Sequence, residues 1–252
     1  MVQSSKGRID WGYNDLKDLA QLGRAIISEF LGTAILVWLA TATCAQFRGN
    51  GETVHVSLTV GFTVATVIQT LAHVGGCHIN PAVTLGFVIM GKTSALRAIL
   101  YVIVQLAGAV AGTEIYKITT PENLRGIGLC SNRVNTAAGV TAEQALVVEI
   151  VLTFCLVLVI LAVSDKNRRP HHGGTGPFIE GLTVCAAFLM GLRYSGVSLN
   201  PARSFGPAIL SNYWEHHWIY WVGPLSGAAI AGYMYRNWFK APKPQKEQNA
   251  NT

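Results

Sequence analysis

The chain has 252 residues, of which 50% are hydrophobic, only 13% are charged and 26 are glycines. Charge this sparse and glycine this frequent are atypical of a soluble protein and typical of packed membrane helices. The formal net charge of +6 could suit nucleic acid. If both termini are cytosolic, however, thirteen of the nineteen Lys and Arg residues fall on the inner side of the membrane. That is the bias of the positive-inside rule, so topology explains the charge and we expect no nucleic-acid partner.

Six apolar segments follow one another along the chain, each long enough or nearly long enough to cross a bilayer. They lie at residues 25–45, 54–74, 95–116, 144–163, 178–194 and 216–236, and the fifth is short and interrupted by glycine. The sequence therefore predicts an all-α membrane protein with six transmembrane helices. The polar first 23 residues precede no cleavage site of the signal-peptide type, so we expect the first span to act as the insertion signal.

The two halves of the chain are related by an offset of 120 residues. Identical residues recur at this offset from Glu29, Thr33, Gly61, Thr63, Val64, Gly76, Asn80 and Gly112. A constant offset indicates two homologous units, and three spans per unit invert the second one in the membrane, with the functional site between them at the midplane. The expected parts are a cytosolic segment 1–23, a first unit 24–116, an extracellular connector 117–142, a second unit 143–238 and a disordered cytosolic tail 239–252.

Each half contains one Asn-Pro-Ala motif, and the six residues are Asn80, Pro81, Ala82, Asn200, Pro201 and Ala202. Asn is a preferred N-cap and Pro is favoured at the first helical position, so helices should begin at Pro81 and Pro201. Apolar residues continue to Gly91 and Ser211, which gives helices about 15 Å long, half the thickness of a hydrocarbon core. Two such half-helices can meet at mid-membrane with their N-terminal ends facing.

The motif itself predicts a function. A capping Asn uses its side-chain oxygen on a backbone N–H, which leaves its NH₂ group to donate into a pore. A water molecule that accepts from both Asn80 and Asn200 cannot pass a proton along the file, and the positive ends of the two helices disfavour cations. The motif pair therefore predicts conduction of a neutral small molecule without ions. Ordinary helix starts in a soluble loop would be the alternative, but both copies lie within apolar sequence.

These motifs carry a resemblance. The paired Asn-Pro-Ala sequences, the Glu-x-x-x-Thr of the first and fourth spans and the segment 200–208 resemble the aquaporin, or major intrinsic protein, family, especially its water-selective animal members. The likeness covers residues 20–238. It implies a right-handed bundle of six helices and two half-helices, a homotetramer with a pore in every subunit, and a passive plasma-membrane channel. It implies no enzyme activity, cofactor or metal, and the sequence holds no HExxH or GxSxG motif.

The resemblance also implies a constriction formed by Val60, Phe188, Val197 and Arg203. Water-selective members usually have Phe at the first position and His at the second, so this chain departs at Val60 and Phe188. Phe188 could narrow the pore, turn aside and leave it permissive, or simply pack in the core. Arg203 would line the constriction, with an Arg that snorkels to the interface as the alternative.

Markers of the resembled family favour water over glycerol. Ser204 follows the Arg where glycerol-conducting members have Asp, Ala208 matches the water class, and Tyr220-Trp221 supplies a bulky aromatic pair. Water is therefore the expected permeant, with a broader channel for glycerol, urea or other small neutral solutes as the alternative. An ion-coupled transporter would need titratable groups, for which Glu29 and Glu149 are the candidates.

The remaining expectations concern support of the pore. Glu29 and Glu149, in the spans, should accept hydrogen bonds from the non-helical backbone before each Asn-Pro, with Thr33 and Thr153 one turn away. The pore-lining or supporting residues expected there are Gly75, Gly76, Cys77, His78, Gly196 and Ser198. His78 lines the pore or is a packed core histidine. The five cysteines form no CxxC and are expected to be packing residues without a disulfide, while His171 and His172 form a candidate pH-sensitive pair.

Overall fold

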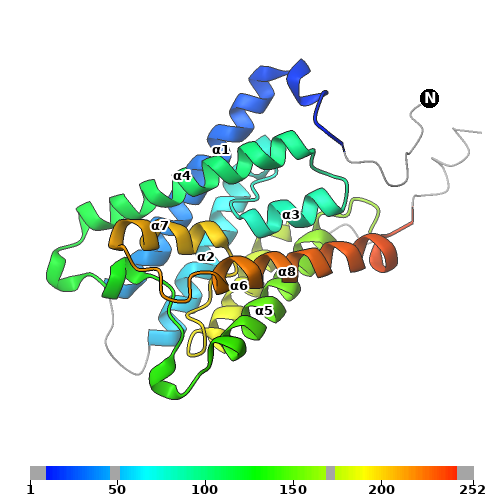
Figure 1. The fold of residues 1–252 in the computed structure, drawn as a ribbon. Helices are drawn as coiled ribbons and strands as arrows, with labels where there is room; N and C mark the ends of the chain where they lie inside the picture. The colour runs from blue at the N-terminus through cyan, green and yellow to red at the C-terminus, as the bar shows by residue number, and fades with distance from the viewer. Residues whose placement is uncertain (1–9, 46–51, 169–173, 243–252) are drawn as a thin grey trace, which may run out of the picture.

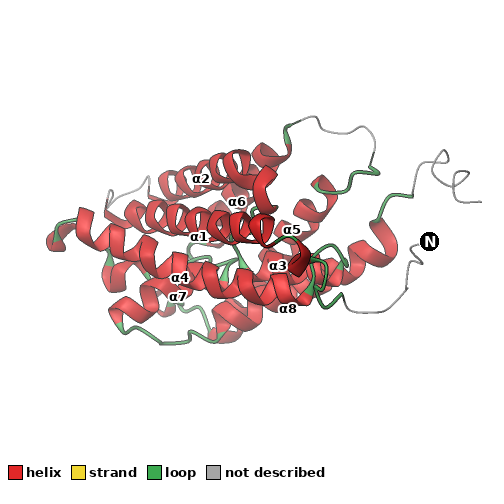
Figure 2. Cartoon of the chain, turned by 90° about the horizontal axis from the view of Figure 1, so that it is seen from above, coloured by secondary structure: helices red, strands yellow, loops and turns green. Residues whose placement is uncertain are grey.

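The structure is a computed structural model that describes residues 10–45, 52–168 and 174–242. Helices account for the regular structure of these residues, and no strand occurs among them (Figures 1 and 2). The eight α-helices in these ranges are α1 Leu19–Ala42, α2 Glu52–Gly75, α3 Pro81–Ile89, α4 Ala95–Thr119, α5 Ala142–Val163, α6 Gly176–Gly191, α7 Pro201–Ser211 and α8 Ile219–Met234. The all-α prediction is confirmed.

Each predicted apolar segment falls on one of the six longer helices. By length and composition, α1, α2, α4 and α5 can each cross a membrane, and α6 is a shorter apolar helix of 16 residues. The α8 helix also has 16 residues and continues into a π-helical turn, Tyr235–Phe239. It begins three residues later than the sequence predicted because His216, with φ 50°, belongs to the turn before it.

The two halves pack as an inverted repeat. The α1 helix packs on α4, α5 packs on α8 in the same way, and α2 packs on α6 across the two halves. The last pair meets at two glycines that the 120-residue offset relates. A Cβ on Gly61 would lie 2.7 Å from the carbonyl oxygen of Gly181, and one on Gly181 would lie 2.4 Å from that of Gly61. Backbone therefore touches backbone where the halves cross, which is why both positions are glycine.

The half-helices α3 and α7 are held between the longer helices, α3 mainly against α8 and α7 against α4 (Figure 1). Glycines again allow the approach. A Cβ on Gly206 of α7 would lie 2.4 Å from the carbonyl oxygen of Ala109 in α4, and one on Gly86 of α3 would lie 2.7 Å from Val157 of α5. The start of each half-helix was predicted correctly, at Pro81 and at Pro201.

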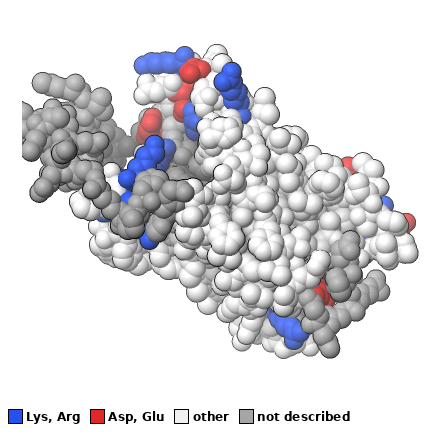
Figure 3. Space-filling view, turned by 180° about the vertical axis from the view of Figure 1, so that it is seen from behind, with Lys and Arg blue, Asp and Glu red and all other residues white. Residues whose placement is uncertain are grey.

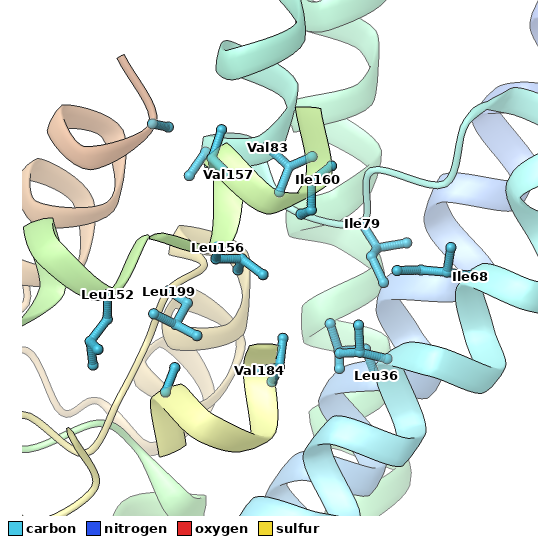
Figure 4. Close-up of a cluster of buried hydrophobic side chains, with 14 of the residues drawn as sticks. Leu36, Ile68, Ile79, Val83, Leu152, Leu156, Val157, Ile160, Val184 and Leu199 are labelled. Atoms are coloured by element: carbon cyan, nitrogen blue, oxygen red, sulfur yellow. The ribbon is translucent and has the colours of Figure 1, made fainter. Parts of the chain in front are cut away.

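Aliphatic side chains from both halves form the interior. Figure 4 shows Leu36, Ile68 and Val184 pointing toward one another from α1, α2 and α6, with Leu156 of α5 nearby. The outside is apolar as well, with exposed side chains such as Ile27, Phe62, Ile103, Val151, Phe178 and Tyr233. On the face in Figure 3, the described charged side chains lie toward the ends, with a wide uncharged band between them. That distribution suits a bilayer as solvent.

Candidate functional site

Two asparagines meet at the centre of the molecule. The side-chain oxygen of Asn80 accepts from the backbone N–H of Ala82 at 2.8 Å, and that of Asn200 accepts from Ala202 at 3.0 Å, so both are the predicted N-caps. The NH₂ group of Asn80 donates to the carbonyl of Leu199, and that of Asn200 donates to the carbonyl of Ile79, each at 2.8 Å. The N-terminal ends of α3 and α7 therefore face each other, as the sequence predicted.

These cross-bonds correct one detail of the sequence analysis. The NH₂ groups are not wholly free, because each already gives one hydrogen to a carbonyl of the opposite repeat. An amide NH₂ carries two hydrogens, so one donor remains on Asn80 and one on Asn200. Both residues line the central cavity, where that remaining hydrogen is available.

The backbone before each asparagine is strained in the same way. Gly76, Cys77 and Ile79 have φ values of 97°, 52° and 46°, and the equivalent values at Gly196, Val197 and Leu199 are 75°, 47° and 56°. The left-handed region suits glycine but costs of order 1–3 kcal/mol for other residues, most of all β-branched ones. Other contacts must therefore hold these segments in place.

Two buried carboxylates supply such contacts. Glu29 accepts from the N–H groups of His78 and Ile79, both at 2.6 Å. Glu149 accepts from those of Ser198 and Leu199, at 2.8 and 3.0 Å. These are the bonds that the bracing interpretation requires, and they occupy oxygens that a proton-carrying transporter would need free.

The side-chain partners of these carboxylates differ between the repeats and were missed from the sequence. Gln105 donates to Glu29 at 2.8 Å, whereas Ser195 donates to Glu149 at 2.6 Å. The offset of 120 could not reveal them because position 225, the counterpart of Gln105, is Leu. Thr33 donates to the main-chain carbonyl of Glu29 at 2.7 Å, so its hydroxyl does not bond the carboxylate. The hydroxyl of Thr153 has no hydrogen-bond partner among the described residues.

A cavity of about 70 Å³ runs past the two asparagines, which is room for several water molecules. Its wall includes nine of the predicted site residues, namely Val60, Gly76, Cys77, His78, Asn80, Phe188, Ser198, Asn200 and Arg203. Phe188 therefore faces the cavity although it is also packed in the apolar core, where it is only 2% exposed.

Three predicted lining residues are not part of this wall. Val197 is fully buried, and one of its methyl groups lies against the position of a Cβ on Gly191, so its side chain is turned toward α6. The carbonyl of Gly75 accepts from the hydroxyl of Tyr101 at 2.7 Å. That of Gly196 accepts from the side chain of Asn132 at 2.7 Å. Partners from elsewhere in the fold thus bind both carbonyls.

Both alternatives for His78 hold at once. Its ring lines the cavity, and it also stacks on Phe87 at 4.5 Å between centroids, with Tyr101 edge-on at 5.3 Å. Its Nδ1 atom lies 3.2 Å from the hydroxyl of Thr84. The ring is therefore both packed and presented to the cavity.

Arg203 is buried, at 7% exposure, and so does not snorkel to the surface. Its guanidinium donates to the carbonyl of Cys130 at 3.0 Å and to the side-chain oxygen of Asn132 at 2.9 Å. Its Nε has no hydrogen-bond partner within the part of the chain that the structure describes. Because Arg203 lines the cavity, it presents a fixed positive charge at the end covered by the connector 117–142. Neither Cys130 nor Asn132 carries a sequence motif, so both were missed.

The cysteine prediction was wrong for one pair. Cys44 and Cys130 form a disulfide with 6.0 Å between their Cα atoms, although 86 residues separate them. The short helix Thr43–Ala45, after α1, is brought to the 3-10 helix Ile127–Cys130 only by the fold. Cys77, Cys155 and Cys185 are free. No group of three or more potential metal ligands occurs among the described residues, and His171 and His172 lie outside them.

Long apolar helices, two half-helices and a cavity between inverted repeats define a membrane channel fold. The family model "Major intrinsic protein" matches residues 17–235, and the chain belongs to this family. It is 40% identical to aquaporin-1 of Homo sapiens over 220 residues, which covers 84% of this chain and 80% of the relative. It is 41% identical to the lens fiber major intrinsic protein of Lithobates pipiens over 213 residues, with the same coverage.

A solved structure agrees with this assignment. The chain is similar to the aquaglyceroporin from Plasmodium falciparum with a TM-score of 0.78 at 27% identity, covering 86% of this chain and 97% of that one. Family membership makes the protein an integral membrane channel of the passive kind and not an enzyme.

Proposed function

We propose that the protein conducts water in single file and excludes protons and other ions. The observation that carries this proposal is the central asparagine pair, whose remaining amide hydrogens open on one cavity from opposite repeats. A water molecule between them accepts from both sides and must point its own hydrogens away along the file. A proton relay through that position is thereby interrupted, and the facing helix N-termini add positive potential against cations.

The constriction in this proposal consists of Val60, Phe188 and Arg203, with Val197 behind the wall. Arg203 donates to the permeant and repels cations. The motif residues Pro81, Ala82, Pro201 and Ala202 fix the half-helices, and Glu29 and Glu149 hold the strained backbone that precedes them. In this assignment neither carboxylate carries protons, which argues against an ion-coupled transporter.

A broader channel that also passes glycerol or urea is the second candidate. The constriction favours this candidate, because it has Val60 and Phe188 where related channels usually have an aromatic ring and a histidine donor. A constriction with fewer hydrogen-bond donors is less selective for water over a less polar solute. The likeness to a protein described as an aquaglyceroporin points the same way.

We further propose a homotetramer in the plasma membrane with both termini cytosolic. This places the connector 117–142 outside, and the segments 24–116 and 143–238 form the two inverted units. The exposed apolar faces of the long helices support contact with lipid and with neighbouring subunits. An ion pair between Asp15 and Arg97 holds the N-terminal segment against the start of α4, at the end expected to be cytosolic. The tail lies outside the described residues from position 243.

Stopped-flow swelling of proteoliposomes tests these alternatives. A channel for water gives fast, weakly temperature-dependent flow that ignores pH and sodium gradients, whereas a coupled transporter is slow and follows a gradient. A panel of water, glycerol and urea, run on the wild type and on Phe188→His, separates narrow from broad selectivity. If the variant lowers the glycerol-to-water ratio, Phe188 makes the constriction permissive. Loss of neutral-solute flow with retained ion current would contradict the whole proposal.

A further inference from the structure

Glu180 is a buried carboxylate that no part of the proposed water pathway uses. It lies on α6, is 8% exposed and lines the same cavity as the two asparagines. Glu29 and Glu149 have their oxygens occupied by N–H donors, but no described residue donates to Glu180 or pairs with it. A buried charged group without a partner is costly, so a cation or an N–H donor that enters the cavity would be stabilised at these oxygens.

The repeat explains where Glu180 lies. The offset of 120 relates it to Val60 of the proposed constriction, just as it relates Phe188 to Ile68, and all four line the cavity. The pair formed by Glu180 and Ile68 is thus the symmetry image of the pair formed by Val60 and Phe188. At one position of this image the chain carries an acid where its counterpart is aliphatic.

Glu180 belongs to the end of the cavity away from Arg203. Side chains on a helix lean toward its N-terminus, and α6 begins at Gly176, one turn before Glu180. Ser164, the C-cap of α5, also lines the cavity and marks the same end. Arg203 contacts the opposite connector, through Cys130. Among the described residues that line the cavity, Arg203 and Glu180 are the only charged ones apart from the titratable His78 and Cys77.

Much of the cavity wall at this end is aliphatic, and the hydroxyl of Ser164 donates to the carbonyl of Ile160 rather than to Glu180. Ile68, Ile160 and Val184 line the wall from α2, α5 and α6 and offer no donor (Figure 4). A guest at this end must therefore supply both the positive charge and the N–H groups that the protein does not. Carboxylates bind planar N–H donors in a bidentate way, and guanidinium is the simplest cation of that shape.

We propose that Glu180 is a binding site for small organic cations that carry N–H donors, and that such a cation plugs the pore. The cation enters from the end marked by Ser164 and is held at the carboxylate. It goes no further, because the facing helix N-termini and Arg203 repel it. Neutral molecules still pass when the site is empty. The blocking role rests on the proposed water function, whereas the binding site does not.

The test uses water permeability of proteoliposomes at pH 8 with guanidinium chloride equal on both sides, far below denaturing concentrations. At about ten times the dissociation constant, mass action leaves about one pore in eleven free, so wild-type permeability should fall about tenfold. Equal sodium chloride should leave it unchanged. Each variant is compared with its own value without guanidinium. Glu180→Gln and Glu180→Val should lose the block, and Glu143→Gln, an exposed acid outside the cavity, should keep it.

A block of the same size in Glu180→Gln, or no block of a conducting wild type, would overturn the proposal. If the wild type conducts no water, the proposed function fails and a second measurement decides the site. Titration calorimetry of the detergent-solubilised protein with guanidinium should show saturable heat for the wild type and Glu143→Gln and none for Glu180→Gln. Equal heat in all three, or none in the wild type, would show that Glu180 binds no such cation.

Discussion

Asn80 and Asn200 are tied to each other's repeat by reciprocal hydrogen bonds of 2.8 Å, each to the carbonyl of the residue just before the other asparagine. The two half-helices therefore do not merely approach. Each cap fixes the loop that positions the other cap, so the orientation of both amides at the cavity is a joint property of the two repeats.

Replacing Asn200 by Asp tests this relation. The carboxylate keeps the capping oxygen but has no hydrogen for the carbonyl of Ile79, and it places an acceptor opposite an acceptor. Leaving a buried acceptor unpaired costs about 1–3 kcal/mol, so thermal unfolding in detergent should shift downward, and water permeability should fall with it. Asn237→Asp is the control, because that exposed amide donates to the carbonyl of Tyr233 in the same helical segment and reaches no asparagine of the other repeat among the described residues. Equal unfolding temperatures for Asn200→Asp and wild type would refute the joint arrangement.

Glu149→Gln should destabilise the protein through the strained segment that it holds. Glu149 accepts three hydrogen bonds, from Ser195, Ser198 and Leu199. An amide presents an NH₂ group to at least one of these donors, so we expect a loss of about 1–3 kcal/mol. The measurement is thermal unfolding, with Glu143→Gln as the surface control. Wild-type stability in Glu149→Gln would mean that the left-handed backbone needs no carboxylate.

The disulfide should act on selectivity through Arg203. Cys130 is bonded to Cys44, and its carbonyl is an acceptor for the Arg203 guanidinium. Cys44→Ser frees this segment, so we expect a loss of stability of about 2–4 kcal/mol and a higher glycerol-to-water permeability ratio. Cys155→Ser, at an exposed free thiol, should change neither. Reduction of the wild type should reproduce the Cys44→Ser values, and a reduced wild type with an unaltered ratio would disprove the link.

Asp165 should make stability depend on pH at the opposite end of the molecule. Burial alone would raise its pKa, but the N–H groups of Ala241 and Asn167 and the hydroxyl of Tyr235 hold the pKa below its ordinary value of 3.8. A carboxyl with a lowered folded-state pKa stabilises the protein above the unfolded pKa, and this stability is lost as pH falls through the folded pKa.

The difference in unfolding temperature between wild type and Asp165→Asn should therefore be full at neutral pH and shrink as the pH falls below 3.8. Thermal unfolding across a pH series measures it, with the exposed Asp18→Asn as the reference for general acid effects. A difference that grows toward low pH would contradict the expected direction of this dependence.

Much of this architecture could be predicted because it depends on local sequence. Apolar length gave the six long helices, and Asn followed by Pro gave the starts of α3 and α7 at Pro81 and Pro201. The repeat also allowed contacts between distant residues to be predicted, since Glu149 should accept the same backbone hydrogen bonds in its half as Glu29 does in the other. Those paired bonds are present in both halves.

Other contacts that support the pore could not be predicted, because the two repeats do not share them. Gln105, Ser195 and Asn132 complete the support of the pore without any motif, and the partners of Cys44 and Arg203 come from a connector with no counterpart in the other half. Val197 was expected at the wall by its distance from the motif, but its left-handed backbone turns it toward Gly191.

The order of residues alone predicts the helical segments, the inversion of the two halves and the two amides that face each other at the centre. The reason is that hydrophobic length, helix capping and a constant offset are properties of local sequence. The fold in three dimensions fixes which hydrogens those amides retain, which side chains line the cavity and which acid of its wall has no partner among the described residues. These outcomes depend on how closely elements far apart in the chain approach each other. A displacement of one element by about the length of a hydrogen bond would change which groups form hydrogen bonds.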